Sequence, residues 1–132
     1  MEKRKILYVE DQAPMRELMK AALRKEFIVV EAASVEEGLD ILRKEAICLV
    51  LMDINLPGGM NGIEGTRAIR STPELQHLPV VVITAYAHDE NRRACLEAGC
   101  VDFIGKPINV REIGGRLTRI LELYGKSEPA PE

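Results

Sequence analysis

The sequence predicts an α/β protein in which five βα units build a doubly wound parallel sheet. Two observations lead to this prediction. Short apolar runs alternate with segments of helical period along most of the 132 residues, and two runs, 47–52 and 80–83, are apolar without interruption. Uninterrupted apolar runs are typical of parallel strands that helices cover on both faces. The strict alternation indicates that the connections between strands are helical.

The first two units are predicted in the N-terminal third of the chain. Apolar runs at 6–9 and 27–30 are the first two expected strands. A helix between them is indicated by residues with helical spacing and a basic last turn, namely Met15, Leu18, Met19, Ala22, Leu23, Arg24 and Lys25. Ser34 and Glu37 have the spacing of a capping box, which predicts a second helix that continues to about Lys44.

The next units follow in the same order. Three further strands are expected, two over the apolar runs 47–52 and 80–83 and one over 101–105. We expect one helix from about Asn61 to a point before Pro73, and a weaker helix over 89–98.

The last helix is predicted to begin at a cap formed by Asn109 and Glu112. Its apolar stripe consists of Val110, Ile113, Leu117, Ile120, Leu121 and Tyr124. We assign 1–125 to a single domain, and 126–132, which is polar and contains proline, to a flexible tail or truncated linker.

Composition excludes several classes of protein. The formal charge of −3 gives no basic excess for nucleic acid or for an anionic membrane surface. No apolar run approaches the ~18 residues of a membrane span, and the N-terminus lacks the apolar stretch of a signal peptide. We therefore expect a cytoplasmic protein that binds neither nucleic acid nor membrane.

The odd number of cysteines argues against a disulfide framework. Cys48 lies in an apolar run and is expected to be a core residue. Cys95 and Cys100 could share a metal ion with His88, but their spacing matches no common zinc pattern, and a packing role is favoured.

Polar and charged residues occur where the predicted strands end. Ligands of open α/β sheets bind beyond the carboxyl ends of the strands. In this sequence four of the five strands place such residues at that edge: Glu10, Asp11, Asp53, Thr84 and Lys106, the last followed by Pro107. A single acid at a strand end is most simply a solvated turn residue, but the whole set at these positions favours a site.

Three carboxylates at one edge require positive charge nearby. Two carboxylates ~4 Å apart repel each other by roughly 4 kcal/mol at an effective dielectric constant near 20. Lys106 supplies one positive charge. A cluster of oxygen donors suits Mg²⁺, which binds one or two carboxylates together with phosphate oxygens and water.

The chain resembles the receiver domain of response regulators in two-component signalling. The resemblance extends over 5–124 and rests on the order and separation of five short motifs: Glu10-Asp11, Asp53-Ile54-Asn55-Leu56-Pro57, Gly62, Thr84-Ala85 and Lys106-Pro107. It implies the flavodoxin-like (βα)5 fold with strand order 2-1-3-4-5.

The resemblance also implies roles for these residues. Asp53 would accept a phosphoryl group from a phosphohistidine of a histidine kinase or a histidine phosphotransfer protein; the second candidate acceptor, Asp11, is better placed to hold metal. Asp11, Asp53 and the backbone carbonyl of Asn55 would bind Mg²⁺ or Mn²⁺, with Glu10 acting through water. Lys106 would pair with the phosphoryl oxygens, or form a simple salt bridge with Asp53 when no phosphoryl group is present.

The resemblance implies that three further residues change their contacts or position the lysine when Asp53 is phosphorylated. The hydroxyl of Thr84 would bind the phosphoryl group, Phe103 would turn inward behind it, and Pro107 would follow a cis peptide bond that directs the lysine. Asn55 and Tyr86 occupy positions that tune hydrolysis of the acyl phosphate, and we expect Tyr86 to shield it from water.

The sequence departs from the family pattern in two places. The loop 57–62 is one residue longer than the common form, and its glycines suggest mobility or positive φ angles. Gly114 and Gly115 are unfavourable inside a helix, so the backbone there either approaches a neighbour closely or is locally soft.

Two other functions were weighed. A phosphatase of the haloacid-dehalogenase kind needs a second acid at position 55, where this chain has asparagine. An interaction module that works without phosphorylation usually lacks the acid pair, the acceptor or the lysine, and all are present here. We therefore expect a phosphoprotein that assists only its own phosphorylation and dephosphorylation, and not an enzyme.

The output is predicted on the face formed by the fourth helix, the fifth strand and the fifth helix, around Arg92, Phe103 and Arg116. A partner protein or a second copy of the chain would bind there. Because the sequence ends soon after the fifth helix, we expect no effector domain. A single-domain regulator, a phosphorelay shuttle and a receiver from a hybrid kinase all fit.

Overall fold

A parallel sheet of five strands forms the centre of the protein, in the order β2-β1-β3-β4-β5. The structure is a computed structural model that describes residues 3–56, 58–85 and 89–125. All four strand pairs are parallel. The strands are β1 (Arg4–Val9), β2 (Phe27–Ala32), β3 (Leu49–Asp53), β4 (Val80–Thr84) and β5 (Asp102–Gly105). The predicted fold class and strand order are confirmed.

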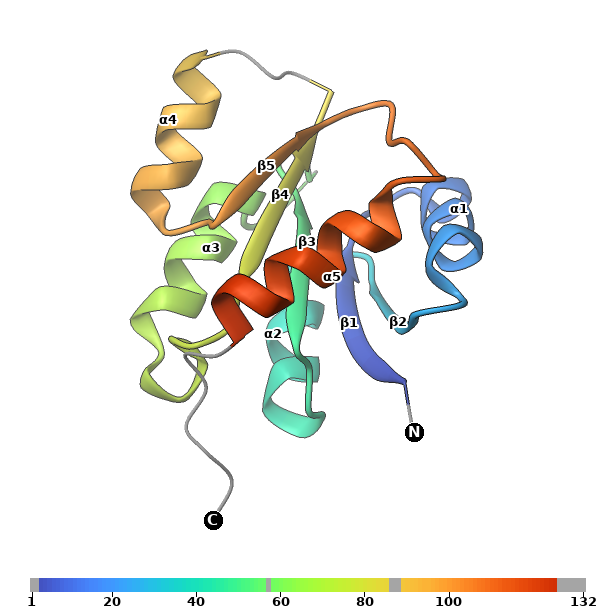
Figure 1. Ribbon diagram of the computed structural model, residues 1–132. Helices are drawn as coiled ribbons and strands as arrows, with labels where there is room; N and C mark the ends of the chain where they lie inside the picture. Colours follow the sequence, from blue (N-terminus) through green and yellow to red (C-terminus); the bar gives the residue numbers. More distant parts are fainter. Residues whose placement is uncertain (1–2, 57, 86–88, 126–132) are drawn as a thin grey trace.

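Helices cover both faces of this sheet (Figure 1). They are α1 (Ala13–Leu23), α2 (Val35–Lys44), α3 (Gly62–Ser71), α4 (Asp89–Ala98) and α5 (Ile113–Tyr124), with a short 3₁₀ helix at Pro73–Leu75. Helices α1 and α5 lie against one face, and α2, α3 and α4 lie against the other. No helix within the described ranges is long and apolar enough to cross a membrane.

The sheet separates two hydrophobic cores because neighbouring strand residues point to opposite faces. Leu7, Val50 and Val82 pack in the core beneath α2, α3 and α4. Ile6 and Leu51 pack in the core beneath α1 and α5. Every residue of β3 and β4 is buried, which explains the two uninterrupted apolar runs. Full burial of an aliphatic side chain stabilises the fold by roughly 1.5–3 kcal/mol.

Side chains at two helix starts satisfy free backbone N–H groups. Asn61 forms a complete capping box, in which its side chain accepts from the backbone N–H of Glu64 (2.9 Å) and its own N–H donates to the Glu64 carboxylate (3.0 Å). At α2 the box is only half formed. Ser34 accepts from the N–H of Glu37 (3.1 Å), whereas the Glu37 carboxylate accepts from Ala33 instead of Ser34 (3.3 Å).

The predicted start of the last helix is wrong by several residues. Helix α5 begins at Ile113, and residues 110–112 form a turn before it. The side chain of Asn109 accepts from the N–H of Arg111 (3.1 Å), and its carbonyl accepts from Ile113 (2.9 Å). Asn109 therefore caps the turn. Val110, expected in the apolar stripe, is 45% exposed.

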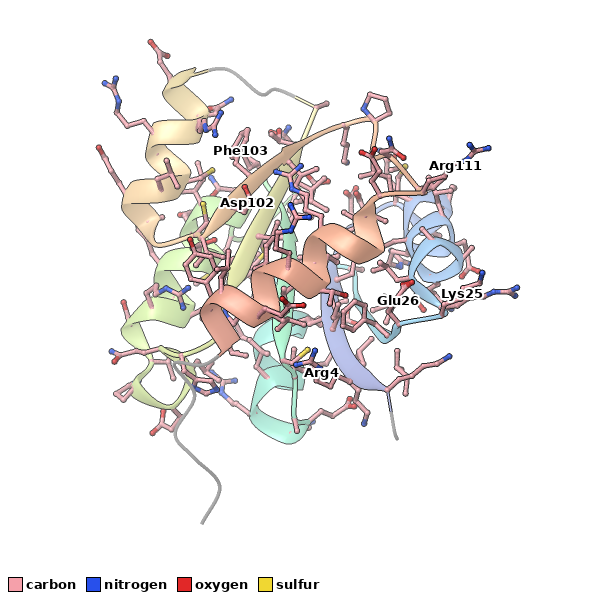
Figure 2. All side chains as sticks on the ribbon, in the orientation of Figure 1. Arg4, Lys25, Glu26, Asp102, Phe103 and Arg111 are labelled. Carbon is pink, nitrogen blue, oxygen red and sulfur yellow. The ribbon has the colours of Figure 1, made fainter. Side chains whose placement is uncertain are left out.

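The two glycines near the start of α5 differ in their surroundings. A Cβ at Gly114 would lie 2.5 Å from the carboxylate of Glu26, which belongs to the turn between α1 and β2. Figure 2 labels Glu26 at this turn, beside α5. A Cβ at Gly115 would meet no atom within 4 Å. The close contact at Gly114 is with the end of an exposed, flexible side chain that could move, so packing strictly requires glycine at neither position.

Cys48, Cys95 and Cys100 form no disulfide bond. Cys95 and Cys100 are buried, and burial raises the pKa of both, that of Cys100 to about 12. Both thiols are therefore protonated at neutral pH. Cys48 is only half buried. His88, the third member of the disfavoured zinc site, and the predicted tail 126–132 lie outside the described residues.

Candidate functional site

Three acidic side chains meet at the carboxyl edge of the sheet. Glu10 and Asp11 follow β1, and Asp53 is the last residue of β3. One carboxylate oxygen of each lies within 4.8 Å of the corresponding oxygens of the others. Glu10 is 1% and Asp53 is 3% exposed. Carboxylates with so little access to water need a positive partner or a metal ion nearby.

Lys106 supplies that partner from the end of β5. Its Nζ donates to Glu10 Oε1 and to Asp53 Oδ2, both at 3.0 Å. Its backbone N–H donates to the carbonyl of Thr84 (2.7 Å), and the following bond to Pro107 is cis, as the resemblance implied. The lysine backbone is therefore fixed on β4, and its ammonium group lies between two buried carboxylates.

The pKa values of this cluster reflect its charges. Burial alone would lower the pKa of Lys106, but the hydrogen bonds and charges of Asp53 and Glu10 outweigh burial and raise it. Burial raises the pKa of Asp11, and contact with the Glu10 carboxylate raises it further. With all four groups ionised, three negative charges face one positive charge. The donor set therefore fits a divalent cation that prefers oxygen ligands.

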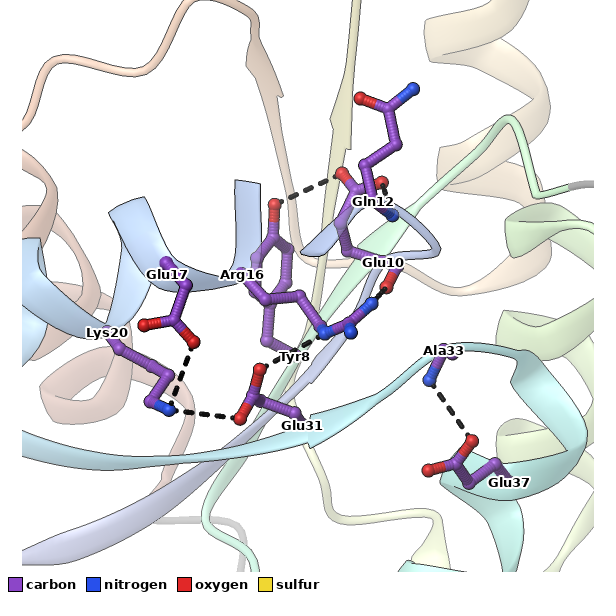
Figure 3. Close-up of polar contacts among 9 residues, drawn as sticks. All are labelled: Tyr8, Glu10, Gln12, Arg16, Glu17, Lys20, Glu31, Ala33 and Glu37. Carbon is purple, nitrogen blue, oxygen red and sulfur yellow. Dashed lines mark hydrogen bonds and ion pairs between the residues drawn. The ribbon is translucent and has the colours of Figure 1, made fainter. Parts of the chain in front are cut away.

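The Glu10 side chain is held by a network that the sequence did not predict (Figure 3). Tyr8 donates its hydroxyl to Oε1 and the N–H of Gln12 donates to Oε2, each at 3.2 Å. Arg16 donates to the Glu10 carbonyl (2.8 Å) and to the Glu31 carboxylate (3.1 Å). Burial, followed by the charge of Glu10, raises the pKa of Tyr8 far above its usual range, so its phenol is a neutral donor.

One sequence signal could have identified Tyr8. Residues two apart in a strand point to the same face, and Tyr8 lies two positions before Glu10. The apolar character of the run 6–9 suggested an ordinary core residue instead.

Both carboxylate oxygens of Asp53 are occupied. Oδ2 accepts from Lys106, and Oδ1 accepts from the backbone N–H of Asn55 (3.1 Å). Gly62, the first residue of α3, donates its N–H to the carbonyl of Ile54 (3.1 Å). A Cβ at Gly62 would lie 2.1 Å from the carbonyl oxygen of Asp53. Only glycine therefore lets α3 begin directly against the backbone of Asp53.

The long loop between β3 and α3 contacts helix α2. Gly58 and Gly59 have φ angles of +69° and +32°, as the glycine pair suggested. The N–H of Met60 donates to the carboxylate of Glu36 (3.1 Å), which occupies the space that a side chain at Gly59 would need. Pro57 lies outside the described residues.

The residues expected to report phosphorylation lie on β4 and β5. Thr84 is fully buried at the end of β4 and is paired in register with Gly105. Phe103 is 8% exposed and packs in the core beneath α2, α3 and α4, so its ring points inward. Tyr86, expected to shield the acyl phosphate, lies outside the described residues.

An ion pair connects β5 to α5 on the predicted output face. Arg116 donates to both carboxylate oxygens of Asp102 (3.1 and 3.2 Å) and to the carbonyl of Phe103 (3.3 Å). Figure 2 shows Asp102 and Phe103 on β5 beside α5. A groove next to this ion pair is lined mainly by basic and apolar residues of α5 and the turn before it: Arg111, Glu112, Gly115, Arg116, Arg119, Ile120, Leu123 and Tyr124.

Comparisons with known proteins agree on one family. The family model described as the response regulator receiver domain matches residues 6–118. The chain is 34% identical to the phosphate regulon transcriptional regulatory protein PhoB of Escherichia coli, over 89% of this chain and 52% of PhoB. It is 32% identical to the cyclic di-GMP phosphodiesterase response regulator RpfG of Xanthomonas campestris, over 93% of this chain and 33% of RpfG.

Solved structures show the same likeness. A response regulator receiver domain protein (CheY-like) from Methanospirillum hungatei superposes with a TM-score of 0.85 at 29% identity, over 96% of this chain and 100% of the other. A putative response regulator from Chloroflexus aurantiacus has a TM-score of 0.86 at 30% identity, over 92% and 99%. The chain spans one third of RpfG and about half of PhoB.

Proposed function

The chain belongs to the response regulator receiver domain family, and from that premise we propose that Asp53 accepts a phosphoryl group from a phosphohistidine donor. The observation that carries the proposal is the contact between Asp53 Oδ2 and the ammonium of Lys106 at 3.0 Å, beside two further carboxylates. A histidine kinase or a histidine phosphotransfer protein would supply the group, in the cytoplasm.

The transfer is a displacement at phosphorus. One carboxylate oxygen of Asp53 forms the new O–P bond while the N–P bond of the donor breaks, and the electron pair of that bond stays on the imidazole nitrogen. The N–H of Asn55 and the Lys106 ammonium orient the carboxylate before transfer. Lys106 then pairs with phosphoryl oxygens as a compact positive charge, and Thr84 donates its hydroxyl to the same group.

A divalent cation completes this site. Asp11, Asp53 and the backbone carbonyl of Asn55 would hold Mg²⁺ or Mn²⁺, and Glu10 would act through water. The excess negative charge of the cluster supports this assignment. When bound, the cation supplies charge that reduces repulsion between the carboxylate and the incoming phosphoryl group.

Phosphorylation by a small acyl phosphate in the presence of Mg²⁺ tests the proposal. Wild-type protein should gain the mass of one phosphoryl group, in a bond that hydroxylamine cleaves, and Asp53→Asn should gain none. No gain by wild type would support an interaction module that works without phosphorylation. Steady turnover of unrelated phosphomonoesters would support a phosphatase and contradict the view that the domain acts only on itself.

In this proposal a second copy of the chain binds to the output face, which is formed by α4, β5 and α5. The groove beside the Asp102–Arg116 pair combines arginines with exposed apolar residues, including Leu123, which is 67% exposed. Sedimentation velocity with and without beryllofluoride and Mg²⁺ should show dimer only in their presence, and Leu123→Glu should prevent it. A monomer under both conditions would direct the search to other partner proteins.

A further inference from the structure

The hydroxyl of Tyr8 contacts the acidic cluster, yet the phosphorylation chemistry proposed above does not use it. Tyr8 is fully buried on β1, and its hydroxyl donates to Glu10 Oε1 at 3.2 Å. A phenylalanine ring would fill the same space in the apolar core. The hydroxyl therefore calls for a reason beyond packing, and the group to which it donates is an acid of the site.

The acceptor oxygen is shared. Glu10 Oε1 accepts from Tyr8 at 3.2 Å and from the Lys106 ammonium at 3.0 Å. The hydroxyl contact is longer than the 2.5–3.0 Å that is typical of O–H···O bonds. In the unphosphorylated state the ammonium is thus the closer donor, and the hydroxyl is a second donor on the same atom.

Phosphorylation would draw the closer donor away from Glu10. The Lys106 ammonium has three N–H donors, and two of them bind Glu10 and Asp53 in the unphosphorylated state. As the ammonium moves toward phosphoryl oxygens on Asp53, its contact with Glu10 would lengthen. Glu10 is 1% exposed, so bulk water has little access to this oxygen, and a buried carboxylate oxygen that loses a donor is destabilised. The other oxygen is already bound by the N–H of Gln12. The Tyr8 hydroxyl already contacts the oxygen that the ammonium leaves.

We propose that Tyr8 is a positioning residue. Its hydroxyl holds the Glu10 carboxylate in place when the Lys106 ammonium moves its hydrogen bond from Glu10 to the phosphoryl group. The proposal rests on the proposed phosphorylation of Asp53. The hydroxyl lowers the free-energy difference between the two positions of the ammonium. It also keeps Glu10 directed at the metal-binding edge in both states.

Tyr8→Phe tests this directly because it removes one oxygen atom and keeps the ring. The phosphorylation rate with a small acyl phosphate, at saturating Mg²⁺ and donor, should fall roughly tenfold, the factor that corresponds to the loss of one hydrogen bond to a charged group. Thr72→Val, which removes a hydroxyl that donates to the Ala68 carbonyl (2.9 Å) at the end of α3, should match wild type. A Tyr8→Phe rate equal to that of wild type would overturn the proposal.

A double-mutant cycle separates this role from a general loss of packing. In a Glu10→Gln background the carboxylate charge is absent, so adding Tyr8→Phe should change the remaining rate by less than about twofold. An equal loss in both backgrounds would show that the hydroxyl acts independently of Glu10 and would contradict the proposal.

Wild-type protein provides a measurement that does not depend on a variant folding. The Cζ resonance of Tyr8 in ¹³C-tyrosine spectra should shift on addition of beryllofluoride and Mg²⁺, as the hydroxyl shortens its bond to Glu10. An unshifted resonance in a protein that binds beryllofluoride would refute the inference alone. Failure of wild type to bind beryllofluoride or to be phosphorylated would refute the proposed function, and the inference with it.

Discussion

Gly62→Ala should damage both the stability of the domain and the geometry of its acceptor. The added Cβ would lie 2.1 Å from the carbonyl oxygen of Asp53, 2.8 Å from its carbonyl carbon and 2.9 Å from the Cα of Ile54. All three are backbone atoms, so no side-chain rotation can relieve the contact. Ordinary contacts begin at 3.4 Å, so the start of α3 and the end of β3 would have to separate by about 1.3 Å.

The magnitude follows from two losses. Forcing one extra carbon into a packed site destabilises a protein by about 1–3 kcal/mol. Separation also stretches the hydrogen bond from Gly62 to the carbonyl of Ile54, which contributes about 0.5–1.5 kcal/mol. We therefore expect the free energy of unfolding to fall by roughly 2–4 kcal/mol. A domain of this size has about 5–15 kcal/mol in total, so most molecules should remain folded.

Urea unfolding followed by circular dichroism measures the first effect, and the phosphorylation rate of the folded variant measures the second. Gly65→Ala is the matched control on the same helix. Its Cβ would lie 3.0 Å from the terminal carbon of Met52 and from one Val35 methyl, which are side-chain atoms that can move. We expect a loss of less than about 1 kcal/mol and a normal rate.

Two results would refute this reasoning. If Gly62→Ala unfolded at the same urea concentration as wild type, the close approach to Asp53 would not exist in solution. If Gly62→Ala and Gly65→Ala were equally destabilised, the contact with backbone atoms would have no special importance.

Three further predictions concern charge and helix propensity. The pKa of Lys106 is raised in the folded state. The charged lysine therefore contributes its full stabilisation below the ordinary lysine pKa near 10.5, and this stabilisation is lost as the pH rises through the folded-state pKa. The difference in unfolding free energy between wild type and Lys106→Met should therefore shrink above about pH 10.5; a constant difference would contradict the assignment. Because the pKa of Asp11 is raised in the folded state, its ionised form opposes folding at neutral pH. Asp11→Asn should therefore stabilise the metal-free domain and reduce the additional stability that Mg²⁺ provides. Thermal unfolding with and without the cation measures both effects. Gly115→Ala, at a position with open space, should raise the free energy of unfolding by about 0.5–1 kcal/mol, and a loss would show that α5 contacts a neighbour there.

Periodicity and strand ends were sufficient to predict most of the fold and the charged members of the site. The carboxyl ends of parallel strands share one edge, so Asp53 and Lys106 could be expected to meet there. The start of α5 was misjudged because Asn109 caps the turn that directly precedes the helix, with the same local hydrogen bonds that begin a helix. The contact of Glu36 with the long loop depends on side-chain directions that spacing alone does not define. The contact of Tyr8 with Glu10 was missed because the apolar run around Tyr8 indicated an ordinary core residue.

The shortness of β5 has a consequence for how a signal could leave the site. The strand comprises only Asp102–Gly105; Arg116 of α5 is bonded to its first two residues, and Lys106 is bonded to β4 immediately after it. If the lysine backbone moves when its ammonium changes partner, we expect this short strand to move with it. The contacts of Arg116 would then transmit the displacement to α5 or break. A partner molecule bound to α5 would therefore be the first to be affected by this displacement.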